Sequence, residues 1–199
     1  FHLAAKNCIP DCQKDPVDTA SINTFGTVNI LNYCQKENLK RVILAESSAI
    51  YEGANVFPTR ETDESPLSFY AISKYCDKLY SEAYSRYMGL KITSLRYFNV
   101  YGPRQDYRRT IPPLMSAIII KLLKGETPNI YGDGSKRRDF IYVDDVNRFH
   151  QSIIDDKRTF GQTYNLGSGV NYSVNEIYNI IDALINTSIK PNHLDDLPG

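Results

Sequence analysis

Short apolar segments alternate with longer amphipathic ones along most of the chain, and this alternation constrains the fold more than any other feature. The run Arg41-Val42-Ile43-Leu44-Ala45 is a short apolar segment of strand length, which suits a parallel strand covered on both faces. It follows a segment from Asp18 to Glu37 whose apolar residues recur at helical spacing, namely Ile22, Phe25, Val28 and Leu31. The alternation predicts an α/β fold built on a parallel sheet.

The rest of the chain carries clear signals for where helices begin and end. A long helix is predicted from Ser68 to Met88, with Gly89 placed to end it as a C-cap. A later helix follows Ser173-x-x-Glu176, which has the form of a capping box. Further strands are predicted at 91–96, 128–131, 140–143 and 163–166, and further helices at 112–124 and 144–154. The second half is less regular than the first.

Charge and composition exclude several classes of partner. The 23 Lys and Arg residues offset 23 Asp and Glu residues, so the net charge is zero, and we expect no binding of nucleic acid or anionic lipid. No apolar run reaches the length that crosses a membrane. The four cysteines, at positions 8, 12, 34 and 76, lack the paired spacing of metal ligands. We therefore expect no metal and no disulfide, and a reducing, cytoplasmic compartment.

Tyr70 and Lys74 are the first candidate catalytic pair. Residues four apart share one face of a helix, so the Lys74 ammonium can lie beside the Tyr70 ring. A nearby cation favours the phenolate and lowers the pKa of a tyrosine from about 10. Ser47 and Ser48 follow a predicted parallel strand directly, at the end where ligands bind in open α/β sheets. The alternative interpretation is an aromatic core residue next to a solvated lysine.

Seven motifs in fixed order make the chain recognisable. They are Phe1-His2-Leu3-Ala4-Ala5, Asn23-x-x-Gly26-Thr27, Ser47-Ser48-Ala49-Ile50-Tyr51, Tyr70-x-x-x-Lys74, Arg96-Tyr97-Phe98-Asn99-Val100-Tyr101-Gly102-Pro103-Arg104, Tyr131-Gly132-Asp133-Gly134 and Arg138-Asp139-Phe140-Ile141-Tyr142-Val143. Together they resemble the extended short-chain dehydrogenase/reductases, the NAD-dependent epimerases and dehydratases of sugar nucleotides. The resemblance covers nearly the whole chain.

The resemblance implies an incomplete Rossmann-like parallel sheet with helices on both faces, plus part of a smaller substrate-binding domain. Residues 1–105 would be the C-terminal portion of the NAD-binding domain. Residues 106–199 would be the substrate-binding region, with 140–168 returning to the Rossmann sheet. The glycine-rich phosphate loop and the ribose-binding acid of the family are not in this sequence. We therefore expect a fragment truncated at both ends, and the choice between NAD and NADP stays open.

The resemblance also assigns roles to residues. Ser47, Tyr70 and Lys74 would be catalytic, with Tyr70 as the acid and base. The cofactor NAD would contact Tyr70 and Lys74 together with Leu3, Ala4, Ala5 and Tyr97. A nucleoside diphosphate sugar would contact Ser48, Asn99, Tyr131 and Arg138. Alternatives stay open for Tyr131 as a core residue, for Arg138 in a solvated turn, and for Asn23 as a structural hydrogen-bonding residue.

The implied reaction is epimerisation at C4 of the sugar through a 4-keto intermediate. Dehydratases of the family carry an Asp-Glu pair just after the catalytic residue, where this chain has Ser48-Ala49, so dehydration is disfavoured. A dehydratase, reductase or decarboxylase of the same family remains an alternative, as does a non-catalytic NAD-binding scaffold protein. The resemblance further implies a homodimer that pairs through the helices at 18–37 and 68–88.

Overall fold

The computed structural model describes residues 1–109 and 111–196, and these form two compact units. Unit 1 contains Phe1–Phe98 and Arg148–Leu166. Unit 2 contains Asn99–Asn147 and the chain from Gly167 onward. The chain changes units at Phe98 because the next strand pairs inside unit 2, whereas the sequence placed the boundary at 105. The segment that returns to unit 1 is 148–166, against an expected 140–168.

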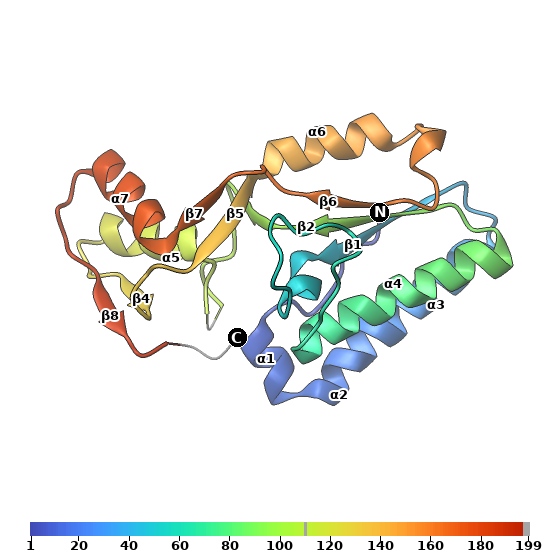
Figure 1. Cartoon of the computed structure of the whole chain (residues 1–199), viewed down its shortest axis with the longest axis horizontal. Helices are drawn as coiled ribbons and strands as arrows, with labels where there is room; N and C mark the ends of the chain where they lie inside the picture. The colour runs from blue at the N-terminus through green and yellow to red at the C-terminus, as the bar shows by residue number, and fades with distance from the viewer. Residues whose placement is uncertain (110, 197–199) are drawn as a thin grey trace. The chain divides into compact units, whose positions relative to one another are not determined.

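Unit 1 is built on a parallel sheet of three strands in the order β1-β2-β6 (Figure 1). The strands are β1 (Val42–Ser47), β2 (Ile92–Tyr97) and β6 (Thr163–Leu166). In register, Val42 lies opposite Ile92, and Ser94 lies opposite Thr163. The first five residues of β1 and of β2 are buried, as expected for strands covered on both faces. The predicted α/β fold with a parallel sheet is confirmed.

Helices cover both faces of this sheet (Figure 1). On one face, α3 (Gly26–Lys36) and α4 (Phe69–Met88) pack on β1 and β2. The buried core there is a cluster of six residues: Leu31, Cys34, Val42, Leu44, Leu90 and Ile92. On the other face, the second half of α6 (Val143–Ile153) packs against β6, with Phe149 edge-on to Tyr164 at 6.1 Å between ring centroids.

The long helix α4 begins and ends where the sequence predicts. Ser68 is the N-cap, and its hydroxyl accepts a hydrogen bond from the Ala71 amide at 3.1 Å. Gly89 ends the helix with a left-handed φ of 71°, a conformation that glycine adopts without steric cost. Glu52 also accepts hydrogen bonds from the amide and the hydroxyl of Ser68, at 2.7 and 2.9 Å. These contacts tie the start of α4 to the turn that follows β1.

The helix predicted at 18–37 is divided in the structure. A short α1 (Ile9–Lys14) and α2 (Pro16–Thr19) precede a π-helical segment, η1 (Ala20–Phe25), which leads into α3. Asn23 lies in η1 and is completely buried. Its Oδ1 accepts a hydrogen bond from the Lys6 amide, and its Nδ2 donates one to the Lys6 carbonyl. Its amide also reaches the Ser73 hydroxyl at 2.9 Å. Asn23 therefore joins three segments of unit 1, which agrees with its structural interpretation.

The opening run Phe1–Ala5, the first of the seven sequence motifs, is mostly irregular. Only His2 pairs with β1, through a single parallel bridge to Leu44. Phe1 and Leu3 are largely exposed, because no second strand lies beside this run among the described residues. One bridge is too little to form an extended ladder, so the run is irregular after His2.

Unit 2 contains two small sheets and a helical pair. The strands β3 (Asn99–Tyr101), β5 (Arg137–Tyr142) and β7 (Asn171–Ser173) form one sheet, and β4 (Asn129–Tyr131) pairs with β8 (Asn192–Leu194) in the other. The predicted capping box is present, since the Ser173 hydroxyl and the Glu176 carboxylate each accept a backbone hydrogen bond at the start of α7 (Val174–Ile185). Helix α7 packs on α5 (Leu114–Leu123) around Ile118, Leu122, Ile177 and Ile181.

Two short 3-10 turns complete the described chain. The turn η2 (Ser48–Tyr51) directly follows β1, and η3 (Lys157–Thr159) precedes β6. None of the helices within residues 1–109 and 111–196 combines the length and the apolar character that a membrane crossing needs. Cys8, Cys12 and Cys34 are buried thiols and Cys76 is a half-buried one.

Candidate active site

The serine pair lies at the carboxyl end of β1. Ser47 is the last residue of the strand and the N-cap of η2, and its hydroxyl accepts a hydrogen bond from the Ala49 amide at 3.2 Å. Ser48 is the first residue of that turn, and both serines are half-buried. The structure therefore places both hydroxyls at the strand end where ligands of parallel α/β sheets bind.

Tyr70 and Lys74 lie in the first two turns of α4, which packs against both β1 and η2. Tyr70 is half-buried, whereas Lys74 is only 3% exposed. The Lys74 ammonium donates to the Ala45 carbonyl at 2.9 Å and to the Asp77 carboxylate at 3.2 Å. Because Ala45 is two residues before Ser47 on β1, the ammonium is fixed beneath the strand end that carries the serine pair.

Asp77 is a buried carboxylate that the sequence analysis missed. Its side chain has no exposed surface and pairs with Lys74 one turn earlier on α4. Burial raises the pKa of Asp77 to about 6, while Lys74 and the Thr27 hydroxyl act in the opposite direction. The signal was present in the sequence, because residues 74 and 77 have the i, i+3 spacing that places side chains on one helical face.

A second buried ion pair lies directly behind the site. Glu46 and Arg96 are opposite each other in register on β1 and β2, and the Arg96 Nε donates to the Glu46 carboxylate at 2.8 Å. Burial raises the pKa of Glu46, and Arg96 acts against that rise. Arg96 also donates to the Tyr51 hydroxyl at 2.7 Å and to Glu64. Fifty residues separate Glu46 and Arg96 in the sequence, and no local pattern pairs them.

Tyr97 ends β2 and is half-buried. Its hydroxyl shares a hydrogen bond with the His150 Nε2 of α6 at 2.7 Å, and burial raises its pKa well above the ordinary value. Of the three cofactor-contacting residues expected in the opening run, Leu3 and Ala4 are exposed and Ala5 is half-buried. Unit 1 thus contains all the predicted catalytic and cofactor residues, together with Ser48.

The remaining predicted substrate residues belong to unit 2. Asn99 begins β3, and its side-chain amide donates to the Asp139 carbonyl of β5 at 2.9 Å. Arg138 is exposed on β5 and not in a turn, and its guanidinium donates to the Arg137 carbonyl. Tyr131 ends β4 with 40% of its surface exposed, which disagrees with the alternative that it is a core residue.

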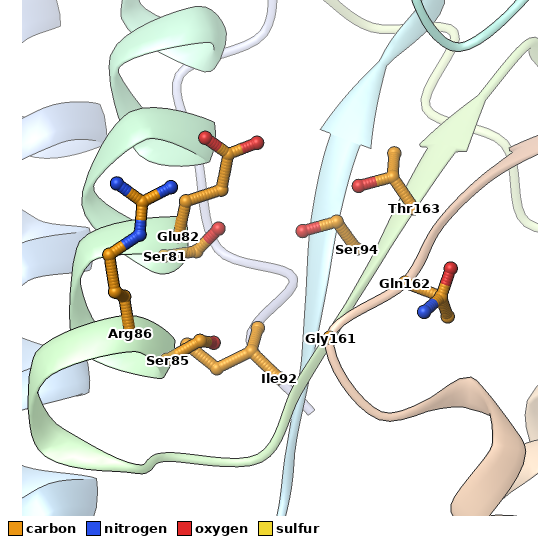
Figure 2. A pocket seen from close by; sticks show the side chains of 9 residues that line it. All are labelled: Ser81, Glu82, Ser85, Arg86, Ile92, Ser94, Gly161, Gln162 and Thr163. Carbon is orange, nitrogen blue, oxygen red and sulfur yellow. The ribbon is translucent and has the colours of Figure 1, made fainter.

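A polar cavity of about 320 Å³ lies elsewhere in unit 1 (Figure 2). Ser81, Glu82, Ser85 and Arg86 of α4 line one side, and Ile92 and Ser94 of β2 with Gly161, Gln162 and Thr163 line the other (Figure 2). It adjoins the first halves of β2 and β6, so it is at the opposite end of the strands from Ser47. None of the predicted site residues lines it, and we do not assign it to the active site.

Within residues 1–109 and 111–196, no group of three or more His, Cys, Asp or Glu side chains is arranged so that it could hold a metal ion. Lys74 and the serine pair lie at one strand end, and Tyr70 is one helical turn before Lys74 on α4. Residues of these types can perform proton transfer.

Fold and site together define a class of protein: an α/β domain with a parallel Rossmann-type sheet and a Tyr-x-x-x-Lys pair beside a serine. Residues 1–167 match the model of the NAD dependent epimerase/dehydratase family. The chain belongs to this family.

Individual relatives agree with this assignment. The UDP-glucuronate 4-epimerase of Thermodesulfobacterium geofontis is 35% identical over 98% of this chain and 59% of its own length. A UDP-N-acetyl-alpha-D-glucosaminuronate decarboxylase of Bacillus cytotoxicus is 33% identical over 98% of this chain and 61% of its own. The crystal structure of a Thermotoga maritima UDP-glucose 4-epimerase with UDP-glucose has a TM-score of 0.95 and 34% identity, covering 100% of this chain and 64% of that one. The chain thus spans about three fifths of the length of these relatives.

Proposed function

We propose that the full-length protein epimerises a nucleoside diphosphate sugar at C4 with NAD as its cofactor. The observation that carries the proposal is the buried Lys74 ammonium, held beneath the end of β1 one helical turn after Tyr70. An ammonium has three N–H donors, and Ala45 and Asp77 accept two of them. Within residues 1–109 and 111–196 no acceptor takes the third N–H, which supports a ribose hydroxyl of the cofactor as its partner.

The residues of this chain divide the work of the reaction. Tyr70 removes the proton from the sugar 4-hydroxyl and later returns it, and the Lys74 cation favours the phenolate that does so. The Ser47 hydroxyl holds the same sugar oxygen against the phenol. NAD, when bound, supplies the redox step at C4 and is regenerated in the cycle. Leu3, Ala4, Ala5 and Tyr97 would line the cofactor, and Ser48 would contact the sugar nearby.

Unit 2 supplies the proposed contacts to the rest of the substrate. The exposed Arg138 guanidinium of β5 matches the geometry of a diphosphate. Asn99 lies on β3, the strand that pairs with β5. Tyr131 offers a partly exposed ring on which a nucleotide base can stack. The relatives named above act on or bind UDP-sugars, which supports a uridine nucleotide as the substrate.

A decarboxylase is the second candidate within the family, because one of the relatives has that activity. Incubating the full-length protein with UDP-glucose, UDP-N-acetylglucosamine and UDP-glucuronate distinguishes the two. Epimers without net NADH support the proposal, whereas a decarboxylated, dehydrated or net-redox product contradicts it. A scaffold protein without activity would turn over none of them.

The variant Tyr70→Phe tests the assigned base. Removing the phenol oxygen should lower kcat by about 10²–10⁴-fold, the usual contribution of general acid–base catalysis. Tyr87→Phe is the matched control, because Tyr87 is on the same helix and is 75% exposed. Full activity in Tyr70→Phe would show that another group moves the proton.

We also propose that two copies of the chain pair through the helical face of unit 1. An apolar groove of about 700 Å³ runs between the segment 16–28 and α4. Phe25 and Ile72 line it and remain 63% and 42% exposed, which is unusual for large apolar side chains grouped in one patch. Phe25→Glu should convert a dimer to a monomer in sedimentation equilibrium, whereas Lys36→Glu at the far end of α3 should not. Monomeric wild-type protein would exclude this pairing.

We place the protein in the cytoplasm, since its cysteines are unpaired thiols.

A further inference from the structure

The buried Asp77 carboxylate interacts both with Lys74 on α4 and with Thr27 on α3. The Asp77 carboxylate bonds the Lys74 ammonium at 3.2 Å and is itself acted on by the Thr27 hydroxyl of α3. That hydroxyl shares a hydrogen bond of 2.9 Å with the His2 Nε2. Asp77 is therefore the one carboxylate, among the described residues, that bonds the proposed catalytic lysine.

The charges around Asp77 come from every element that packs on it. Lys74 is on the same helix as Asp77, and the Thr27 hydroxyl that bonds Asp77 belongs to α3. Glu46 of β1 acts on Asp77 as a like charge. Glu46 is itself neutralised by Arg96 of β2. His2, on the segment beside β1, has its pKa lowered by burial and by the Lys74 charge. Of the two carboxylates in this group, Asp77 is the one that bonds Lys74.

We infer that Asp77 is a positioning residue for the proposed reaction: it holds the Lys74 ammonium at the end of β1 and keeps that buried group charged. A lysine that is 3% exposed is disfavoured as a cation unless it is paired. The Ala45 carbonyl supplies a hydrogen bond but only a partial charge. The full counter-charge comes from Asp77, so the cation that acidifies Tyr70 depends on it. This inference rests on the proposed function for its catalytic consequence.

The test uses the full-length protein and the variant Asp77→Asn, which keeps the volume and removes the charge. The Lys74 Nζ signal is followed by nitrogen NMR against pH, without substrate. In Asp77→Asn the titration of the Lys74 Nζ should lie at least one pH unit below that of the wild type, a tenfold change in proton concentration. The alkaline limb of kcat against pH should move with it, while KM changes little.

Two further variants separate positioning from simple structural support. Asp77→Glu restores the carboxylate and should recover part of the wild-type pH profile. Glu82→Gln removes a half-exposed carboxylate from the same helix, paired with Lys78 at 3.5 Å, and should leave Lys74 and the profile unchanged. If Asp77→Asn does not fold, the same NMR titration of the wild-type protein tests the inference. The Lys74 Nζ signal should then shift over the pH range in which the Asp77 carboxyl titrates.

The inference is overturned if Lys74 titrates identically in the wild type and in Asp77→Asn, or, where that variant does not fold, if its signal ignores the titration of Asp77. Failure of the proposed function gives a different result. The full-length protein would then leave UDP-sugars unchanged, while the Lys74 signal would still respond to Asp77.

Discussion

Replacing Arg96 by methionine should strongly destabilise unit 1. The Arg96 side chain is completely buried, and so is its partner Glu46. Methionine fills a similar length of the core but leaves the Glu46 carboxylate without its counter-charge. It also removes the donors to the Tyr51 hydroxyl and to Glu64. An uncompensated charge would then remain between two central strands.

The expected loss follows from the burial of both partners. Removing one partner of a buried ion pair typically costs about 3–5 kcal/mol, a large part of the roughly 5–15 kcal/mol that stabilises a domain. The exposed pair Lys121–Glu126 is the matched comparison, with an N–O distance of 2.6 Å and both side chains 47% exposed. Exposed pairs contribute about 0–1 kcal/mol, so Lys121→Met should have little effect on the free energy of unfolding.

The loss in Arg96→Met should also depend on pH. Burial already raises the pKa of Glu46 although Arg96 lowers it, so without Arg96 the pKa rises further. The folded state then binds a proton that the unfolded state has released. The free energy of unfolding should fall as pH increases, by at most about 1.4 kcal/mol per pH unit. The variant should therefore be closer to the wild type at pH 5 than at pH 8.

Urea unfolding of the full-length protein at pH 5 and pH 8 measures both effects. Adding Glu46→Gln to Arg96→Met removes the orphaned charge, and the double variant should regain stability at pH 8. The reasoning is refuted if Arg96→Met costs less than about 1 kcal/mol at both pH values, or if Glu46→Gln lowers its stability further.

Three other predictions concern stability. Because the pKa of Asp77 is raised to about 6 from 3.8, its stabilising effect is complete well below pH 3.8 and is lost as pH rises through 6. The loss of stability between pH 4 and pH 7 should therefore be about 2 kcal/mol smaller in Asp77→Asn, measured by urea unfolding. Ser173→Ala removes the capping-box hydroxyl of α7 and should cost about 1 kcal/mol in thermal unfolding, with Ser173→Thr close to the wild type. Gly134 has a φ of 76°, and a β-carbon there would lie 2.1 Å from the Asn175 Oδ1. Gly134→Ala should therefore lower the free energy of unfolding by about 1–2 kcal/mol. The control Gly26→Ala, whose added β-carbon would have its nearest contact at 3.8 Å, should not destabilise α3.

Local signals predicted the regular elements well. The start of α4 lies within one residue of its prediction, and the C-cap at Gly89 and the capping box at Ser173 lie where the sequence placed them, because each depends on hydrogen bonds within a few residues. The π-helical segment at Ala20–Phe25 was not predicted. It accompanies contacts of Asn23 with Lys6 and Ser73, and no local pattern reveals such distant partners.

The chain boundaries of the units also depended on distant pairing. Asn99 comes two residues after the end of β2, yet it pairs with Phe140 of β5, which moves the change of units to Phe98. The short strands β3, β7 and β8 were not predicted, because runs of three residues carry little periodic signal.

The sequence by itself determined the family, the parallel α/β fold and the identity of the Tyr70–Lys74 pair, because ordered motifs and side-chain periodicity are local properties of the chain. The tertiary structure alone decided what surrounds that pair. Helical spacing already places Asp77 near Lys74, but only tertiary packing buries that pair, and only the sheet brings Glu46 to Arg96. Burial and charge pairing are properties of three-dimensional neighbours, so the electrostatics of the site could not be predicted from the order of residues.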